Sequence, residues 1–190
     1  KFNSPMEPGP QTETTSSTLD AQRPRGRWYL ALVKRVLLWG LAGYLTFAVV
    51  MMIFEDTFIY FPSPYPEGDW QPTGIPFEDA WFLSADGTRL HGWYVPRPDP
   101  KAVVLFCHGN AGNLSHRAGT LYELNQMVGL SVLIFDYRGY GRSEGSPNEK
   151  GVVADARAAR AWLAERAGID ESDVVLMGRS LGGAVAVDLA

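Results

Sequence analysis

The chain has 190 residues, 46% hydrophobic and 20% charged, a composition that fits one folded domain with an appendage. Its net charge of −4 at pH 7 gives no electrostatic footprint for a nucleic-acid partner. A single cysteine excludes a disulfide framework within the chain, and the three histidines lack zinc-ligand spacing, so neither a metal nor another cofactor is predicted. Cys107 stands in an apolar run and is expected to be a buried structural thiol.

The N-terminal part of the sequence divides into three segments. Residues 1–26 are rich in polar residues, glycine and proline, and we expect a disordered polar tail there. Residues 27–35 form a basic juxtamembrane segment, and residues 36–54 are a run of 19 residues without a charge. A helix of that length spans about 28 Å, close to the roughly 30 Å hydrocarbon core of a bilayer. The run therefore predicts a transmembrane helix.

Two other interpretations of the run at 36–54 are less favoured. A buried core helix would carry a polar stripe, and a cleaved signal peptide would need a small-x-small cleavage site. The sequence offers neither, so an uncleaved single-pass anchor is expected. Basic residues precede the run and Glu55 and Asp56 follow it, so the positive-inside rule predicts a cytoplasmic N-terminus with the rest of the chain across the membrane. Tyr60 and Phe61 are expected near the membrane interface.

A globular domain is predicted after a linker. Residues 55–74 are expected to connect the helix to a domain at 75–190, because residues 61–79 contain five prolines. Asp86-Gly87 between two apolar runs indicates a β-hairpin. Apolar runs at 102–107, 131–135 and 173–177 predict buried strands, with helices over 114–128, after a capping box from Ser146 to Glu149, and from Leu181 onwards. This order predicts an α/β fold with a mostly parallel sheet and flanking helices.

The sequence Gly178-Arg179-Ser180-Leu181-Gly182 connects the last predicted strand to a helix of small residues. A Gly-x-Ser-x-Gly match alone is weak evidence, but a strand before it and a helix after it are the setting of a nucleophile elbow. There the serine adopts a strained backbone, and the flanking glycines, Gly178 and Gly182, let neighbouring backbones approach. Ser180 is therefore the candidate nucleophile, and a purely structural turn is the alternative.

A second motif, His108-Gly109-Asn110-Ala111-Gly112-Asn113, follows the strand at 102–107. Acyl-transfer hydrolases of this topology need a backbone N–H from that loop to complete an oxyanion hole. Asn110 is the candidate for that donor and Leu181 for the second, while Gly109 lets the backbone turn. His108 precedes Ser180 in the chain, so we expect it to brace the loop rather than to act as the catalytic base.

Three stretches, FCHGNAGNLSHR, VLIFDYRGYGRSEGSP and VVLMGRSLGGAVA, resemble the α/β-hydrolase superfamily, and most closely its membrane-anchored branch of lipase- and thioesterase-like proteins. The resemblance covers about residues 75–190 and implies Ser180 as nucleophile, with Asn110 and Leu181 as oxyanion-hole donors. It also implies a catalytic acid and then a histidine after the nucleophile. Because nothing follows Ala190, both are expected beyond this chain. Asp136 precedes Ser180 and is expected in a structural loop, paired with Arg138 or Arg142.

The expected function of the intact protein is that of a membrane-anchored serine hydrolase. It would cleave ester or thioester bonds through an acyl-enzyme on Ser180. An anchor that holds the site near the bilayer favours a small acyl or lipid-like substrate. These 190 residues alone are expected to be inactive, because they lack the acid and the histidine. The alternative is a non-catalytic, membrane-tethered binding protein that keeps the hydrolase fold.

Overall fold

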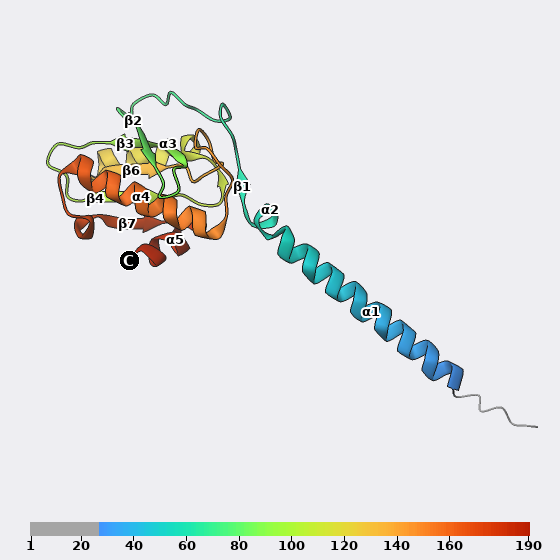
Figure 1. Ribbon diagram of the computed structural model, residues 1–190. Helices are drawn as coiled ribbons and strands as arrows, with labels where there is room; N and C mark the ends of the chain where they lie inside the picture. Colours follow the sequence, from blue (N-terminus) through green and yellow to red (C-terminus); the bar gives the residue numbers. More distant parts are fainter. Residues whose placement is uncertain (1–26) are drawn as a thin grey trace, which may run out of the picture. The chain divides into compact units, whose positions relative to one another are not determined.

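The computed structural model describes residues 27–190 (Figure 1). The polar tail expected over residues 1–26 lies outside the described residues. A boundary between Val49 and Val50 divides the chain into two compact units.

A long apolar helix, α1 (Arg27–Ile53), makes up the described part of the first unit and continues into the second. Its most apolar stretch has a mean hydropathy of 2.2, and by length and composition the helix could cross a membrane. The basic residues at 27–35 belong to the same helix. Within the part of the chain that the structure describes, no residue of α1 is buried, and most of its apolar side chains are exposed.

The second unit is built on a five-stranded sheet in the order β2-β3-β6-β4-β7. Strands β2 (Glu78–Leu83) and β3 (Arg89–Val95) form an antiparallel hairpin, and β3 is also antiparallel to β6 (Ser131–Phe135). Strands β6, β4 (Val103–Cys107) and β7 (Val175–Gly178) are parallel. The α/β fold with a mostly parallel sheet is confirmed, and β7 lies at one edge.

Helices cover both faces of this sheet (Figure 1). Alternate residues of a strand point to opposite faces: Leu105 of β4 packs in one buried cluster, and Phe106 in the other. The first cluster includes residues of α4 and α5, and the second includes residues from the segment expected to be helical at 114–128. That segment consists of three short turns of different pitch. The helices are α4 (Glu149–Ala167), α5 (Leu181–Leu189), η1 (Leu114–Arg117), α3 (Ala118–Tyr122) and the π-helical η2 (Glu123–Val128).

Helix α4 begins later than the capping box at Ser146 predicts. Asn148 is the N-cap, and its side-chain oxygen accepts a hydrogen bond of 2.8 Å from the Gly151 N–H. Asparagine caps a helix as well as serine does, and the extended backbone of Asn148 (φ −156°, ψ 161°) places its oxygen over the first turn. The predicted Ser146 cap is therefore wrong by two positions.

The segment expected to be a linker is ordered against the second unit. It contains helix α2 (Glu55–Ile59) and strand β1 (Phe61–Pro62), which pairs in parallel with β5 (Ala111–Gly112). Tyr60 is only 7% exposed, and its side chain packs in the core of this unit. We call residues 60–70 the strap.

Candidate active site

Ser180 stands at a sharp turn between β7 and α5. Its backbone has φ 53° and ψ −119°, a conformation that costs a residue with a side chain about 1–3 kcal/mol. The Arg179 N–H donates to the Cys107 carbonyl at 3.1 Å, and the Gly182 N–H donates to the Arg179 carbonyl at 3.0 Å. Ser180 is exposed. This strained, exposed turn has the geometry of a nucleophile elbow.

The two glycines that flank Ser180 lie where the backbone leaves no room for a side chain. A Cβ atom on Gly178 would be 2.1 Å from the Gly182 carbonyl oxygen. A Cβ atom on Gly182 would be 2.0 Å from the Cys107 carbonyl oxygen. Both gaps are far below van der Waals contact, so α5 can approach β7 and β4 this closely only because Gly178 and Gly182 have no side chains.

The loop that follows β4 faces this turn. A Cβ atom on Gly109 would lie 3.7 Å from the Ser180 Cβ and 3.4 Å from the Arg179 carbonyl oxygen. The fold thus brings together the two motifs that the sequence singles out. Among residues 27–190, neither the Asn110 N–H nor the Leu181 N–H donates a hydrogen bond to another protein group. Both main-chain donors are therefore available beside the serine.

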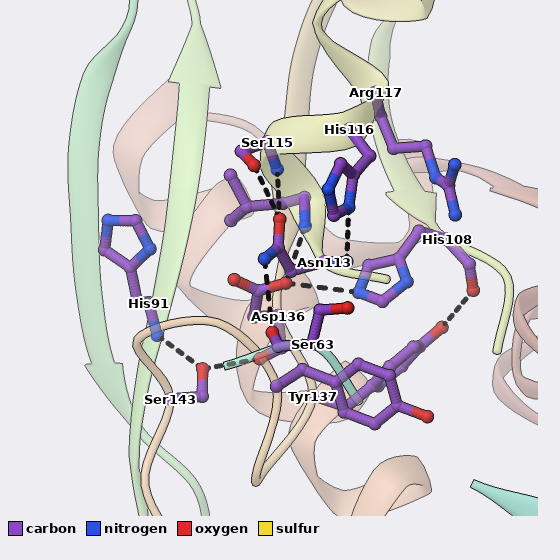
Figure 2. A network of polar contacts seen from close by, with 12 residues as sticks. Ser63, His91, His108, Asn113, Ser115, His116, Arg117, Asp136, Tyr137 and Ser143 are labelled. Atoms are coloured by element: carbon purple, nitrogen blue, oxygen red, sulfur yellow. Dashed lines mark hydrogen bonds and ion pairs between the residues drawn. The ribbon is translucent and has the colours of Figure 1, made fainter. Parts of the chain in front are cut away.

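The His108 ring is fully buried and points toward Asp136 (Figure 2). Its Nδ1 lies 2.7 Å from the Gly109 carbonyl oxygen, and its Nε2 lies 3.4 Å from Oδ1 of Asp136. The buried Asp136 carboxylate also accepts a 2.7 Å hydrogen bond from the Leu114 N–H. These contacts connect both ends of the loop at 108–113 to the interior, so His108 and Asp136 brace it.

The pairing expected for Asp136 with an arginine is wrong. Arg138 instead binds Asp155, with Nη2 2.7 Å from Oδ1, and Nη1 lies 2.8 Å from Oδ2 of Asp86. The nearest carboxylate to Arg142 is that of Asp79, at 3.7 Å. The Asp136 side chain points inward to Leu114, whereas Asp155 reaches Arg138 from helix α4. The hydrogen bond that Asp86 accepts from Arg138 holds the pKa of the Asp86 carboxyl well below its usual range.

The side chain of Asn110 makes contacts that sequence reasoning missed. Its Nδ2 donates to the Ile59 carbonyl, and its Oδ1 accepts from the Phe61 N–H at 3.3 Å and from the Tyr140 hydroxyl at 2.9 Å. Burial raises the pKa of Tyr140, so this hydroxyl stays protonated and can donate. No sequence signal points to these contacts, because Ile59 and Phe61 precede the expected start of the domain at residue 75.

Asn113, the last residue of the same motif, also holds the strap (Figure 2). Its Nδ2 donates to the carbonyls of Ser63 at 3.1 Å and Glu67 at 2.8 Å. Its Oδ1 accepts from the Ser115 N–H at 3.0 Å, which caps η1. Both asparagines of the motif at 108–113 therefore connect the loop beside Ser180 to the segment that follows α2.

Comparison with known proteins agrees with this fold. Residues 98–190 match the family model described as serine aminopeptidase, S33. The α/β hydrolase domain-containing protein WAV2 of Arabidopsis thaliana is 37% identical over 158 residues, which cover 78% of this chain and 51% of WAV2. The uncharacterized membrane protein YNL320W of Saccharomyces cerevisiae is 32% identical over 164 residues, covering 83% of this chain and 57% of the yeast protein.

A solved structure shares the same architecture. The esterase Pf2001 of Pyrococcus furiosus superposes with a TM-score of 0.56 at 25% identity, covering 67% of this chain and 52% of the esterase. The chain belongs to the α/β-hydrolase superfamily. It spans about half the length of the curated relatives it matches.

Proposed function

We propose that the whole protein, meaning the complete open reading frame that contains these residues, is a membrane-anchored serine hydrolase that cleaves ester or thioester bonds. The observation that carries this proposal is the strained, exposed Ser180 facing the loop at 108–113. The Ser180 oxygen attacks the substrate carbonyl, the alcohol or thiol leaves, and an acyl-enzyme forms. Water then attacks the acyl-enzyme and releases the acid.

The two free main-chain donors supply the electrostatic part of this mechanism. The N–H groups of Asn110 and Leu181 stabilise the oxyanion of each tetrahedral intermediate, and Leu181 opens helix α5, whose N-terminus favours negative charge. Loss of one such donor typically lowers kcat by about 10²–10³-fold. Stabilisation of the oxyanion therefore depends on the main chain of the loop at 108–113 rather than on a charged side chain.

The base that activates Ser180 comes from outside these residues in this proposal. Each of the three histidines has another partner: His108 contacts Asp136, His91 Nε2 lies 2.7 Å from Asp79, and His116 Nδ1 accepts from a main-chain N–H at 3.1 Å. The superfamily places its acid and its histidine after the nucleophile. The matched segment covers only about half of each curated relative, 52% of one and 51% of another, which leaves room for both.

Membrane attachment and a lipid-like acyl substrate complete the proposal. The length and hydropathy of α1 and the yeast relative that is called a membrane protein support the attachment. The predicted membrane span ends close to the site along the chain. Ile59, whose carbonyl binds Asn110, is five positions after Phe54, and five residues reach at most about 18 Å even when fully extended. The positive-inside rule puts the N-terminus in the cytoplasm and Ser180 on the other side.

An active-site serine probe tests the proposal. A fluorophosphonate should label the whole protein in isolated membranes, and Ser180→Ala should abolish the labelling. Equal labelling of both proteins would contradict the assignment of Ser180, and a wild type that never labels would favour the non-catalytic binding protein. A glycosylation acceptor inserted in the exposed loop at residues 98–100 should be modified if the domain lies outside the cytoplasm.

A further inference from the structure

The strap runs between the two loops that follow the central parallel strands. On one side the Ser63 N–H donates to the Gly112 carbonyl at 3.2 Å. On the other, the Gly141 N–H donates to the Ser63 carbonyl at 3.0 Å, and the Tyr65 N–H donates to the Gly141 carbonyl at 2.9 Å. The strap therefore bridges the loop beside Ser180 and the loop after β6 through main-chain hydrogen bonds, as an added strand does.

Stacking fixes the far end of the strap. The Arg142 guanidinium lies 4.6 Å from the centre of the Tyr65 ring and 4.7 Å from that of Trp70. Trp70 in turn packs edge-to-face on the buried Trp93, with ring centres 5.8 Å apart. A cation that contacts two adjoining aromatic rings favours one geometry. The strap is thus held along its length as part of the hydrolase unit.

Asn110 belongs both to the candidate oxyanion hole and to the contacts that dock the residues leaving helix α2. Its main-chain N–H is the candidate oxyanion donor, while all three hydrogen bonds of its side chain go elsewhere: to Ile59, to Phe61 and to Tyr140. Rotation of the Asn110 backbone that turned the N–H away from Ser180 would carry the side chain off these partners. The direction of the N–H is therefore linked to the docking of the residues that leave helix α2.

We infer that the Asn110 side chain is a positioning group through which the membrane-proximal strap sets the geometry of the oxyanion hole. The inference rests on the proposed function and deepens it, because it makes the segment between the anchor and the hydrolase domain part of the active site. Hydrolysis then depends on strap docking even for a soluble substrate that never meets the bilayer.

The test removes the contact from either side in the whole protein. Asn110→Ala keeps the main-chain N–H but removes the side chain. Phe61→Pro removes the main-chain N–H that binds Asn110, together with the exposed Phe61 ring. Tyr60 already has the extended backbone (φ −100°, ψ 132°) that a residue before proline requires. With a short-chain p-nitrophenyl ester, each variant should lower kcat at least tenfold with KM within about twofold, because an oxyanion donor acts in the transition state.

The double variant shows whether the two changes act through one contact. If they do, Asn110→Ala combined with Phe61→Pro should be no slower than the slower single variant. Multiplying effects, or a wild-type kcat in Asn110→Ala, would overturn the inference. Asn148→Ala is the matched control, since it removes an asparagine cap from α4 away from the strap. It should lower Tm and leave kcat unchanged.

A readout without catalysis separates this inference from the proposed function. Hydrogen exchange of the Asn113 and Leu114 amides, which are hydrogen-bonded to His116 Nδ1 and Asp136 Oδ1 at the end of this loop, should be at least tenfold faster in Phe61→Pro than in the wild type, and unchanged exchange would overturn the coupling. If Phe61→Pro does not accumulate, Tyr140→Phe removes a different partner of the same Asn110 oxygen and should accelerate the same amides. If the wild type never reacts with the fluorophosphonate, the proposed function is contradicted. The hydrogen-exchange result would still decide whether the strap and the loop at 108–113 are coupled.

Discussion

The Cα of Gly182 lies so close to the end of β4 that an added Cβ would stand 2.0 Å from the Cys107 carbonyl oxygen. The same oxygen accepts the Arg179 N–H at 3.1 Å. The Cys107 carbonyl thus binds the turn through the Arg179 N–H and leaves no room for a side chain at Gly182, in the first turn of α5. Ser180, between these two contacts, keeps its left-handed backbone because both neighbours are fixed.

Gly182→Ala should therefore disrupt the turn, and its neighbour supplies the matched control. We expect Gly182→Ala to destabilise the protein by about 1–3 kcal/mol, the usual cost of overpacking, and to abolish fluorophosphonate labelling. A Cβ on Gly183 would meet nothing closer than 3.8 Å, so Gly183→Ala should be tolerated and should stabilise α5 by up to about 1 kcal/mol. Thermal unfolding and labelling of both variants check this, and equal behaviour would contradict it.

The buried ion pair behind the site predicts a large loss of stability. Asp155 is fully buried and accepts both the Arg138 N–H, at 2.9 Å, and the guanidinium, at 2.7 Å. Removing Asp155 leaves the buried Arg138 with the half-exposed Asp86 as its only carboxylate partner, so Asp155→Ala should cost about 3–5 kcal/mol in urea unfolding. The exposed pair of Asp188 and Arg157, at 3.1 Å, is the comparison: Asp188→Ala should change stability by less than about 1 kcal/mol. Similar losses in both variants would refute the argument.

Local patterns predicted the strands and the elbow well, because their determinants are neighbours in sequence. The strand expected over 131–135 is β6, since a short continuous apolar run is what a strand buried on both faces requires. The strained Ser180 followed from the glycines on either side of it. The choice of Asn148 over Ser146 as cap was open, because both residue types cap helices and only the backbone decides between them.

The strap could not be predicted from the sequence for a different reason. Strand β1 has two residues, too few for a period of two to be recognised, and its partner β5 lies about fifty positions later. Five prolines suggested an extended tether, which describes the backbone but not what it contacts. The burial of Tyr60 and the inward turn of Asp136 likewise depend on three-dimensional neighbours, so neither could be read from the flanking residues.

The thiol of Cys107 should report unfolding. The side chain is fully buried, and burial raises the pKa of Cys107 from 9.0 to about 12. A shift of three units lowers the thiolate fraction at pH 8 about a thousandfold, and the thiolate is the reactive form. We expect no reaction with an aromatic disulfide in the native protein and rapid reaction in urea. Cys107→Ser is the control, because a signal that it lacks comes from this thiol. Rapid reaction of the native wild type that is absent in Cys107→Ser would contradict the prediction and show that the core opens.

His91 should make the stability of the hydrolase unit sensitive to mild acid. Its ring is fully buried beside Trp81, with ring centres 4.6 Å apart, and Nε2 lies 2.7 Å from Oδ1 of Asp79. Burial lowers the pKa of His91, and the hydrogen bond to Asp79 and the charge of Asp136 oppose this only in part. The folded state therefore favours the neutral ring, whereas the unfolded chain binds a proton near pH 6.5.

The sign of the pH effect follows from that difference. Below about pH 6.5 the unfolded state binds more protons than the folded state, so the free energy of unfolding falls as the pH drops, until the folded ring is protonated as well. His91→Gln removes this contribution, so its loss of stability between pH 7.5 and 5 should be smaller than that of the wild type. Asp79→Asn removes the opposing hydrogen bond to the carboxylate and should extend the loss to lower pH. Urea unfolding at a series of pH values measures both, and parallel curves for the wild type and His91→Gln would show that the buried ring does not carry the effect.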